Sequence, residues 1–402
     1  MSNPTATAVN AADWPDIARV PNSPFRAWVA RKLLEGIARK VDVKVTTPDG
    51  KVHGNPNSEQ HLEILDNAFF HRLGADLKIG LGESYMAGDW RVAEGSDLAL
   101  VLTPFAARLD QIVPQWLRTF RRVIEPRHPS DEENSKNNTR RNISRHYDLS
   151  NDLFANFLDS TMTYSAAWFE LPFAEAGFEH LPNAQRKKVD GVLDFGHVVE
   201  NANVLEIGTG WGQLALQASS RGANVHTVTL SSEQQALAQT RIDEAGLTAR
   251  VNIELKDYRD VVGQYDSVVS VEMIEAVGEK YWPIYFGKVA ECLKPGGHFG
   301  LQAITMNHQR LLESKHAYTW IHKYIFPGGI IPSVEVCEAE AKKAGMQIVD
   351  RRSLRLDYAH TLKLWRERYF ANLEKIRGFG FDETFDKMWE FYLAYSEAGF
   401  RS

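Results

Sequence analysis

Three closely spaced glycines, Gly208, Gly210 and Gly212, lie in the segment EIGTGWG and could hold a ligand derived from a nucleotide. The segment follows the apolar run 203–207 and precedes a helical pattern, so we expect a strand that turns into a helix. Turns that bind dinucleotides carry G-x-G-x-x-G and an acidic residue at the end of the second strand. Here the third glycine comes one residue early, and the second strand ends on Thr-Leu-Ser at 229–231.

These departures favour a ligand without a pyrophosphate, and S-adenosylmethionine (SAM) is such a ligand. Glycine lets the backbone approach the carboxylate and amine of the methionine part closely. Asp257 and Tyr258 follow the third strand, where the adenine would lie, and VVSVEMIEAVG ends the fourth strand at the carboxyl edge of the sheet. The alternative is a tight corner between strand and helix that binds nothing.

The elements that position these residues alternate between strand and helix beyond residue 200. Such alternation predicts an α/β fold with a doubly wound parallel sheet and helices on both faces. The predicted strands are 203–207, 224–230, 251–255, 267–271, 298–304 and 347–350.

The chain of 402 residues is long enough for two domains. Near the N-terminus, a helical pattern at 24–40 precedes a hairpin pattern with an Asp-Gly turn, and a second helical pattern covers 97–123. We therefore predict a smaller N-terminal α+β domain, associated with lipid or membrane, at 1–124. The polar segment 125–141 is predicted to be a linker, and 142–402 the catalytic domain.

Composition excludes several classes of protein. The net charge of −6 argues against a general nucleic-acid binder, and two cysteines without a CxxC pair argue against a disulfide framework or a metal site. No segment has the pattern of a signal peptide or of a membrane span, so we expect a cytoplasmic location.

Several long motifs carry a resemblance to a known family. They are HYDLSNDLFANFLDSTMTYSAAWF, VEMIEAVGEKYWPIYF and KYIFPGGIIPS, together with LGESYMAGDW and YLAYSEAGFRS. From about residue 70 to the C-terminus, the chain resembles the cyclopropane-fatty-acyl-phospholipid synthases, which include the mycolic acid methyltransferases, and especially their actinobacterial members. The resemblance implies a class I SAM-dependent methyltransferase with a Rossmann-like sheet. It also implies methyl transfer to the cis double bond of an unsaturated phospholipid acyl chain, through a carbocation.

The resemblance also implies which residues bind the cofactor and the base. The residues expected to bind SAM are Tyr164, Ser165, Glu206, Gly208, Gly210, Gly212, Thr229, Leu230, Gln234, Asp257 and Tyr258. The base implied by the family is a bound bicarbonate ion, held by Glu275, the backbone of Ile304 and Tyr358. The chain departs from well-known members at two positions of this catalytic group, with Ala166 where they have cysteine and Gln302 where they have histidine.

Two products remain open. Direct ring closure of the cation gives a cyclopropane, the commoner product of the family and our first expectation. A hydride shift followed by loss of a methyl proton gives a methylene chain, the precursor of a 10-methyl branched chain, and would require a reductase partner. Two hypotheses from different functional classes also stay open: a methyltransferase for small molecules or nucleic acids, and a lipid-binding relative without catalytic activity.

An unsaturated phospholipid substrate requires contact with a membrane. The segment 108–128 is apolar on one side and basic on the other, which predicts a helix lying on the inner face of the membrane. The alternative is a solvated helix packed on its own domain. The oligomeric state stays open, and a homodimer is one form that we consider.

Overall fold

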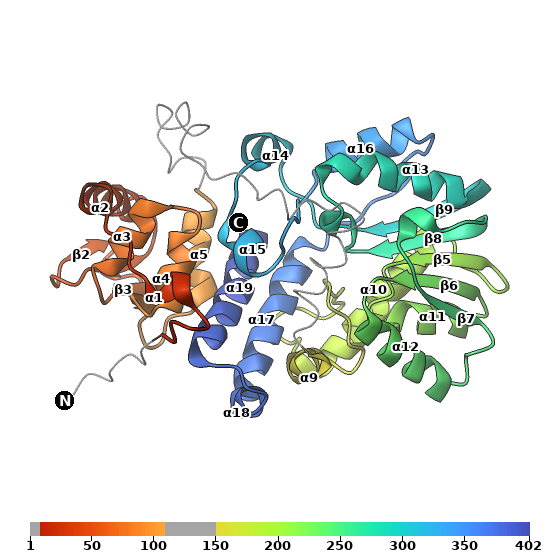
Figure 1. The fold of residues 1–402 in the computed structure, drawn as a ribbon, viewed down its shortest axis with the longest axis horizontal. Helices are drawn as coiled ribbons and strands as arrows, with labels where there is room; N and C mark the ends of the chain where they lie inside the picture. The colour runs from red at the N-terminus through yellow and green to blue at the C-terminus, as the bar shows by residue number, and fades with distance from the viewer. Residues whose placement is uncertain (1–8, 109–149) are drawn as a thin grey trace. The chain divides into compact units, whose positions relative to one another are not determined.

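The computed structural model describes residues 9–108 and 150–402, which belong to two compact units (Figure 1). The first unit takes in Met1–Pro126, Tyr318–Ile325 and Leu362–Ser402, and the second takes in Arg127–Ala317 and Phe326–Thr361. The predicted linker at 125–141 and most of the predicted basic helix at 108–128 lie outside the described residues. Both therefore stay predictions.

The second unit contains a five-stranded sheet in which all neighbouring strands are parallel. The order is β7-β6-β5-β8-β9, so the direction of winding changes beside β5. The strands are β5 (Asn203–Ile207), β6 (Asn224–Thr229), β7 (Val251–Leu255), β8 (Tyr265–Val271) and β9 (Leu293–Gln302). The predicted α/β fold is confirmed. The predicted strand at 347–350 is wrong, because this segment has no strand pairing.

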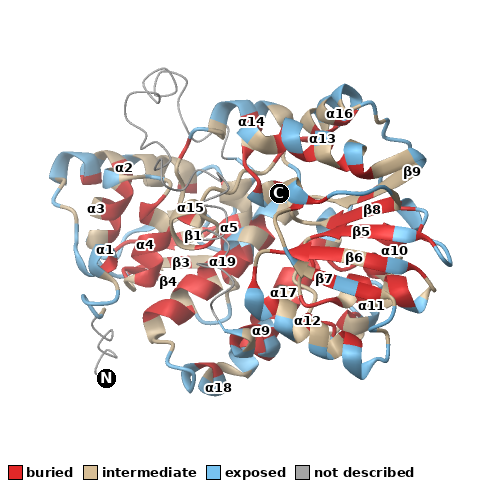
Figure 2. Ribbon diagram, turned by 45° about the vertical axis from the view of Figure 1, so that its right-hand side comes forward, coloured by how far each residue is buried: buried red, intermediate tan, exposed pale blue. Residues whose placement is uncertain are grey.

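Helices cover both faces of this sheet, as strands buried on both sides require. Side chains of α10, α11 and α12 pack with Val204 and Val225 on one face, and those of α13 and α16 pack with Leu205 and Val228 on the other. Figure 2 shows the strands as a largely buried layer between helices with exposed outer sides. The helices are α9 (Asn151–Phe157), α10 (Leu181–Phe195), α11 (Gln213–Ser220), α12 (Ser232–Glu244), α13 (Trp282–Cys292), α14 (His308–Ser314) and α16 (Val334–Lys343).

The sequence also fixes where several of these helices begin. Ser231 caps α12 by accepting a hydrogen bond from the backbone of Gln234 at 3.2 Å, and Ser333 caps α16 through Val336 at 3.2 Å. Such caps satisfy backbone N–H groups that have no partner inside the helix. The start of α12 is thereby fixed directly after β6.

The first unit has a four-stranded sheet in the order β2-β1-β3-β4. The predicted hairpin is confirmed: β1 (Lys44–Thr46) and β2 (Val52–Gly54) pair antiparallel, and β3 (His61–Ile64) and β4 (Trp90–Val92) complete the sheet. The helices of this unit are α1 (Pro15–Ala18), α2 (Pro24–Ala38), α3 (Ala68–Ala75), α4 (Gly80–Met86), α5 (Leu98–Ala106), α15 (Trp320–Tyr324), α18 (Leu373–Arg377) and α19 (Glu383–Arg401).

The C-terminal residues differ from the predicted domain organisation. The prediction assigned them to the catalytic domain, whereas Leu362–Ser402 group with the N-terminal residues. Helix α17 (Arg355–Ala371) therefore begins in one unit and ends in the other. Within the first unit, α19 packs on α4 and α5. No helix in the described part of the chain is both long enough and apolar enough to cross a bilayer.

Candidate functional site

The glycine turn directly follows β5 and has the left-handed backbone that its glycines predict. The φ angles of Gly208, Gly210 and Gly212 are +96°, +51° and +87°. A Cβ atom on Gly212 would lie 3.0 Å from the Cβ of Ala238 in α12, whereas a Cβ on Gly210 would meet no described atom within 4 Å. Gly212 therefore allows close packing of the turn on α12, and Gly210 borders open space.

Two buried polar atoms near this turn have no hydrogen-bond partner among the described residues: Oε2 of Glu206 and the hydroxyl of Tyr258. Glu206 is 2% exposed, and its burial raises the pKa of its carboxyl group to about 8. Buried polar atoms without partners are costly unless a ligand or water satisfies them. A buried carboxyl oxygen and a buried hydroxyl without partners fit a ligand with an amine and further polar groups, as SAM has.

Other residues expected to bind SAM make local contacts. Thr229 donates a hydrogen bond to Gln234 at 3.1 Å, and Leu230 lies between β6 and the cap of α12. Asp257, two residues after β7, accepts three hydrogen bonds from Arg259, at 2.9 Å from the backbone, 2.8 Å from Nε and 2.5 Å from Nη2. The carboxylate of Asp257 is thus positioned by its own neighbour.

The segment with Tyr164 and Ser165 is held by α10. Gln185 donates to the backbone carbonyl of Ser165 at 2.9 Å, and the ammonium group of Lys188 donates to its hydroxyl. Lys188 is only 1% exposed, and its burial lowers the pKa of the ammonium group to about 8. The sequence analysis did not single out Lys188, because it lies in an ordinary amphipathic helical pattern.

Glu272 is the residue on which the predicted catalytic group converges, and the sequence analysis missed it. Its Oε1 accepts hydrogen bonds from the backbone N–H of Ala166 and from Nε2 of Gln302, both at 2.9 Å. Its Oε2 accepts a hydrogen bond from the hydroxyl of Tyr358 at 2.6 Å. One signal could have identified it: an acidic residue directly after an apolar strand, at the edge of the sheet where ligands bind.

Glu275 lies one turn further along the chain and has a different environment. Its Oε1 accepts a hydrogen bond from the backbone of Ile304, and its Oε2 is buried without a hydrogen-bond partner among the described residues. Burial, together with the nearby charge of Glu272, raises the pKa of Glu275 to about 8. At neutral pH the carboxyl group of Glu275 is therefore mostly protonated.

The residues of the predicted catalytic group thus fall into two sets. Ala166, Gln302 and Tyr358 surround Glu272, and Ile304 contacts Glu275. A bicarbonate ion on the first three donors would compete with the carboxylate of Glu272 for the same hydrogen bonds, and it would add a second negative charge. The described residues around Glu272 therefore do not fit a bound bicarbonate ion.

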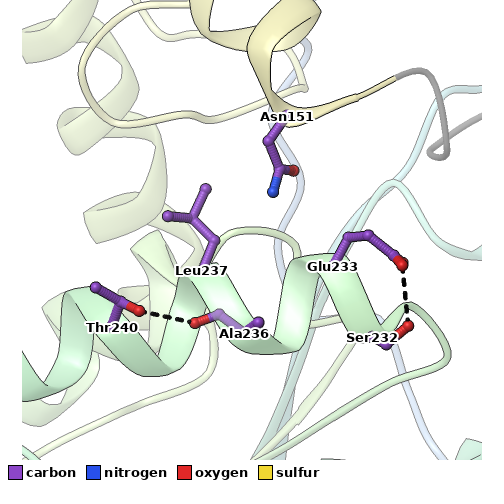
Figure 3. Close-up of a pocket in the computed structure, with 6 residues that line it drawn as sticks. All are labelled: Asn151, Ser232, Glu233, Ala236, Leu237 and Thr240. Carbon is purple, nitrogen blue, oxygen red and sulfur yellow. Dashed lines mark hydrogen bonds between the residues drawn. The ribbon is translucent and has the colours of Figure 1, made fainter.

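A surface pocket elsewhere in the second unit contains none of these catalytic residues (Figure 3). It lies along α12 and is lined by Asn151, Ser232, Glu233, Ala236, Leu237 and Thr240. Thr240 donates to the carbonyl of Ala236 and Ser232 to Glu233, both at 3.1 Å, so these polar groups have partners within their own helix (Figure 3). Within residues 9–108 and 150–402, no cluster of His, Cys, Asp or Glu could hold a metal ion.

Comparisons with known proteins show the family of the chain and its fold. Residues 134–402 match the family described as mycolic acid cyclopropane synthetase. A tuberculostearic acid methyltransferase of Mycobacterium tuberculosis is 47% identical over 100% of this chain and 95% of its own length. The cyclopropane-fatty-acyl-phospholipid synthase of Escherichia coli (strain K12) is 34% identical over 87% of this chain and 86% of its own length. A crystal structure of a mycolic acid cyclopropane synthase complexed with SAH and CTAB aligns with a TM-score of 0.59 and 28% identity, over 65% of this chain and 93% of its own.

Proposed function

Because the chain belongs to the mycolic acid cyclopropane synthetase family and is a SAM-dependent methyltransferase, we propose that it methylates the cis double bond of an unsaturated phospholipid acyl chain. The proposed product is the methylene chain, the precursor of a 10-methyl branched chain. The family resemblance alone favours the cyclopropane, the commoner product. A relative that matches the whole chain at 47% identity and is named a tuberculostearic acid methyltransferase favours the methylene product.

One structural observation carries this choice of product. At the two positions where the chain departs from well-known members of the family, Gln302 donates to Glu272 from its side-chain amide and Ala166 from its backbone N–H. The departures therefore lie together, around one carboxylate at the edge of the sheet. A changed environment for proton removal is expected to change the fate of the cation, since a difference of about 1.4 kcal/mol between two barriers alters a product ratio tenfold.

SAM supplies an electrophilic methyl group when it is bound. The chain's own residues have three tasks: to bind the cofactor, to exclude water and to accept a proton. The glycine turn and Glu206 are proposed to hold the methionine part, and Asp257 and Tyr258 the adenosine part. Bicarbonate is not part of this proposal, because Tyr358, which the resemblance assigns to it, already donates to the carboxylate of Glu272, as do the backbone of Ala166 and the side chain of Gln302.

The substrate suggests further partners. A phospholipid requires contact with a membrane surface, so we propose a peripheral location on its inner face. A methylene product requires a reductase that converts it to the methyl branch. The segment 108–128 stays the predicted membrane contact, and the question of a homodimer stays open.

The test is to express the chain in cells that contain oleoyl phospholipids but no enzyme of this family. The lipids are then separated by gas chromatography before and after mild hydrogenation. The methylene product should be converted to a methyl-branched chain, whereas a cyclopropane should survive. If the methylated product resists hydrogenation, the cyclopropane is the product and the proposed choice is wrong.

A further inference from the structure

The backbone of Glu272 has a conformation that is costly for its residue type. Its φ angle is +48°, in the left-handed region where the Cβ atom of a non-glycine residue crowds the backbone. The conformation is held by the end of β9, since the N–H of Glu272 donates to the carbonyl of Gln302 at 2.8 Å. Strain that the surrounding structure maintains is found most often at functional sites.

The side chain of Glu272 is held as firmly as its backbone. Its three donors come from three separate places in the chain: the loop at Ala166, the end of β9 at Gln302 and the first turn of α17 at Tyr358. Gln302 contacts Glu272 twice, because its backbone carbonyl accepts from the Glu272 backbone and its side chain donates to the carboxylate. Donors of this kind stabilise the ionised form of a carboxyl group.

Glu272 and Glu275 differ in how their charge is stabilised. Burial raises the pKa of Glu272, but hydrogen bonds from Tyr358, Ala166 and Gln302 and the charge of Lys188 oppose this. No cation lowers the pKa of Glu275, and the negative charge of Glu272 raises that pKa further. Of the two acids, Glu272 therefore has the surroundings that stabilise a negative charge better: three hydrogen-bond donors and the ammonium group of Lys188. Acids whose environments separate them in this way commonly divide the roles of base and acid.

We propose that the carboxylate of Glu272 is the catalytic base of this enzyme, in the place where the family resemblance implies bicarbonate. The proposal rests on the proposed function, since only a cationic acyl intermediate needs a base. The π electrons of the alkene form a bond to the methyl carbon, and the carbon–sulfur bond breaks with its electron pair going to sulfur. A hydride then moves from the methyl-bearing carbon to its neighbour.

Glu272 acts in the next step. Its carboxylate takes a proton from the new methyl group, and the electrons of that C–H bond become the second bond of the methylene group. The positive charge of the cation and the negative charge of Glu272 cancel, so the step leaves an uncharged acyl chain and a neutral carboxyl group. Tyr358 and Gln302 act as positioning residues, because they hold the two oxygens of the carboxylate.

The first experiment compares purified wild type with Glu272→Gln, which keeps the shape of the side chain but cannot accept the proton. Methylated lipid is measured on vesicles of dioleoyl phosphatidylglycerol, and SAH affinity by calorimetry. We expect methylene formation to fall about 100-fold or more, the usual contribution of a general base, while SAH affinity changes less than about threefold. The matched control is Glu291→Gln, because Glu291 is 63% exposed and pairs only with Lys288 among the described residues.

The second experiment replaces the missing carboxylate from solution. Glu272→Gly accepts the φ angle of +48° without strain and leaves room for a small anion. Added formate or bicarbonate should raise the rate of Glu272→Gly at least about tenfold, with saturation, and should not raise that of wild type or Glu272→Gln. With trideuteromethyl SAM, Glu272→Gln should show a larger isotope effect on product formation than wild type, because proton removal becomes slow.

The outcomes separate this proposal from the proposed function. If wild type forms no methylated lipid, the proposed function is wrong, and so is the assignment of Glu272 as its catalytic base. If wild type is active and Glu272→Gln keeps more than about a tenth of its rate, the base lies elsewhere and only the proposal is overturned. The same conclusion follows if Glu272→Gly binds SAH normally but small anions fail to rescue it.

Discussion

At the scale of single residues, Gly210 offers a way to separate cofactor binding from folding. Its backbone is left-handed, at +51°, and a Cβ atom would meet open space. We expect Gly210→Ala to lower the free energy of unfolding by about 1–2 kcal/mol, from the conformation alone. SAH affinity should also fall, by more than this loss of stability explains, because the added methyl group would take space that the cofactor needs. Calorimetric titration with SAH measures this loss.

The control for this prediction is Gly246→Ala. Gly246 also has a left-handed backbone, at +69°, and open space around its Cβ position, but it follows α12, away from the glycine turn. It should show a similar loss of stability and normal SAH affinity. Equal SAH affinities in the two variants would mean that the turn at Gly210 does not contact the cofactor.

The raised pKa values of Glu206 and Glu275 predict how stability depends on pH. Both are about 8 in the folded protein, compared with an ordinary value of 4.5. Between these values the folded state binds more protons than the unfolded state, so stability falls as pH rises. We expect the Tm of the ligand-free protein to be lower at pH 8 than at pH 6. Glu206→Gln should make this dependence weaker, and an unchanged slope would argue against the raised pKa of Glu206.

The catalytic residues show how far sequence reasoning reached at this scale. The motifs pointed to Ala166, Gln302, Tyr358 and Glu275, and the structure brings the first three together. They surround Glu272 rather than an open anion site. This centre could not be predicted from spacing, because Glu272 depends on a left-handed backbone and on partners 106 and 86 residues away in the chain.

At the scale of elements, the start of α17 fixes the loop that carries Ala166. Thr361 accepts a hydrogen bond from the backbone of Ala167 at 3.1 Å, and Asp357 accepts one from Phe169 at 2.9 Å. Thr361 and Ala167 are fully buried, each at 0% exposed. The same helix carries Tyr358, so one element positions both the loop and the carboxylate of Glu272.

Thr361→Val is expected to lower the free energy of unfolding by about 1–3 kcal/mol, because it leaves the buried N–H of Ala167 without an acceptor. Turnover should fall as well, since the neighbouring Ala166 donates to Glu272. The control is Thr361→Ser, which keeps the acceptor oxygen. Chemical denaturation and the rate of lipid methylation measure the two effects. If Thr361→Val is as active as Thr361→Ser, the loop does not depend on this contact.

The strands illustrate both the success and the limit of periodicity. Five predicted strands form the sheet, because their apolar side chains are buried between two layers of helices. The segment 347–350 has a similar local pattern, but Ile348 is 42% exposed and Val349 is 82% exposed. Without burial, an alternating pattern does not give a strand. Whether a segment pairs with another strand depends on tertiary contacts, which a local sequence pattern does not show.

At the scale of the whole molecule, the two ends of the chain build one unit. Arg366 of α17 forms ion pairs with Asp97 at 2.7 Å and with Glu397 of α19 at 3.1 Å. Glu397 is 1% exposed and Arg366 is 9% exposed. The assignment of residues 362–402 to the catalytic domain missed this grouping, because contacts between residues about 270 and 30 positions apart leave no local pattern.

Glu397→Ala tests whether this unit and the cofactor-binding unit are independent. The substitution leaves the buried guanidinium group with one partner fewer, so we expect the first unit to lose about 3 kcal/mol of stability. Glu367→Ala is the control, since Glu367 is 57% exposed in an i,i+4 pair on the same unit, and its loss should cost less than about 0.5 kcal/mol.

Calorimetry with and without SAH distinguishes the units, because SAH raises the Tm only of the unit that binds it. SAH affinity should remain close to wild type in Glu397→Ala, since every residue assigned to SAM lies in the second unit. A loss of SAH affinity that parallels the loss of stability would show that the cofactor site depends on the unit built by the chain ends.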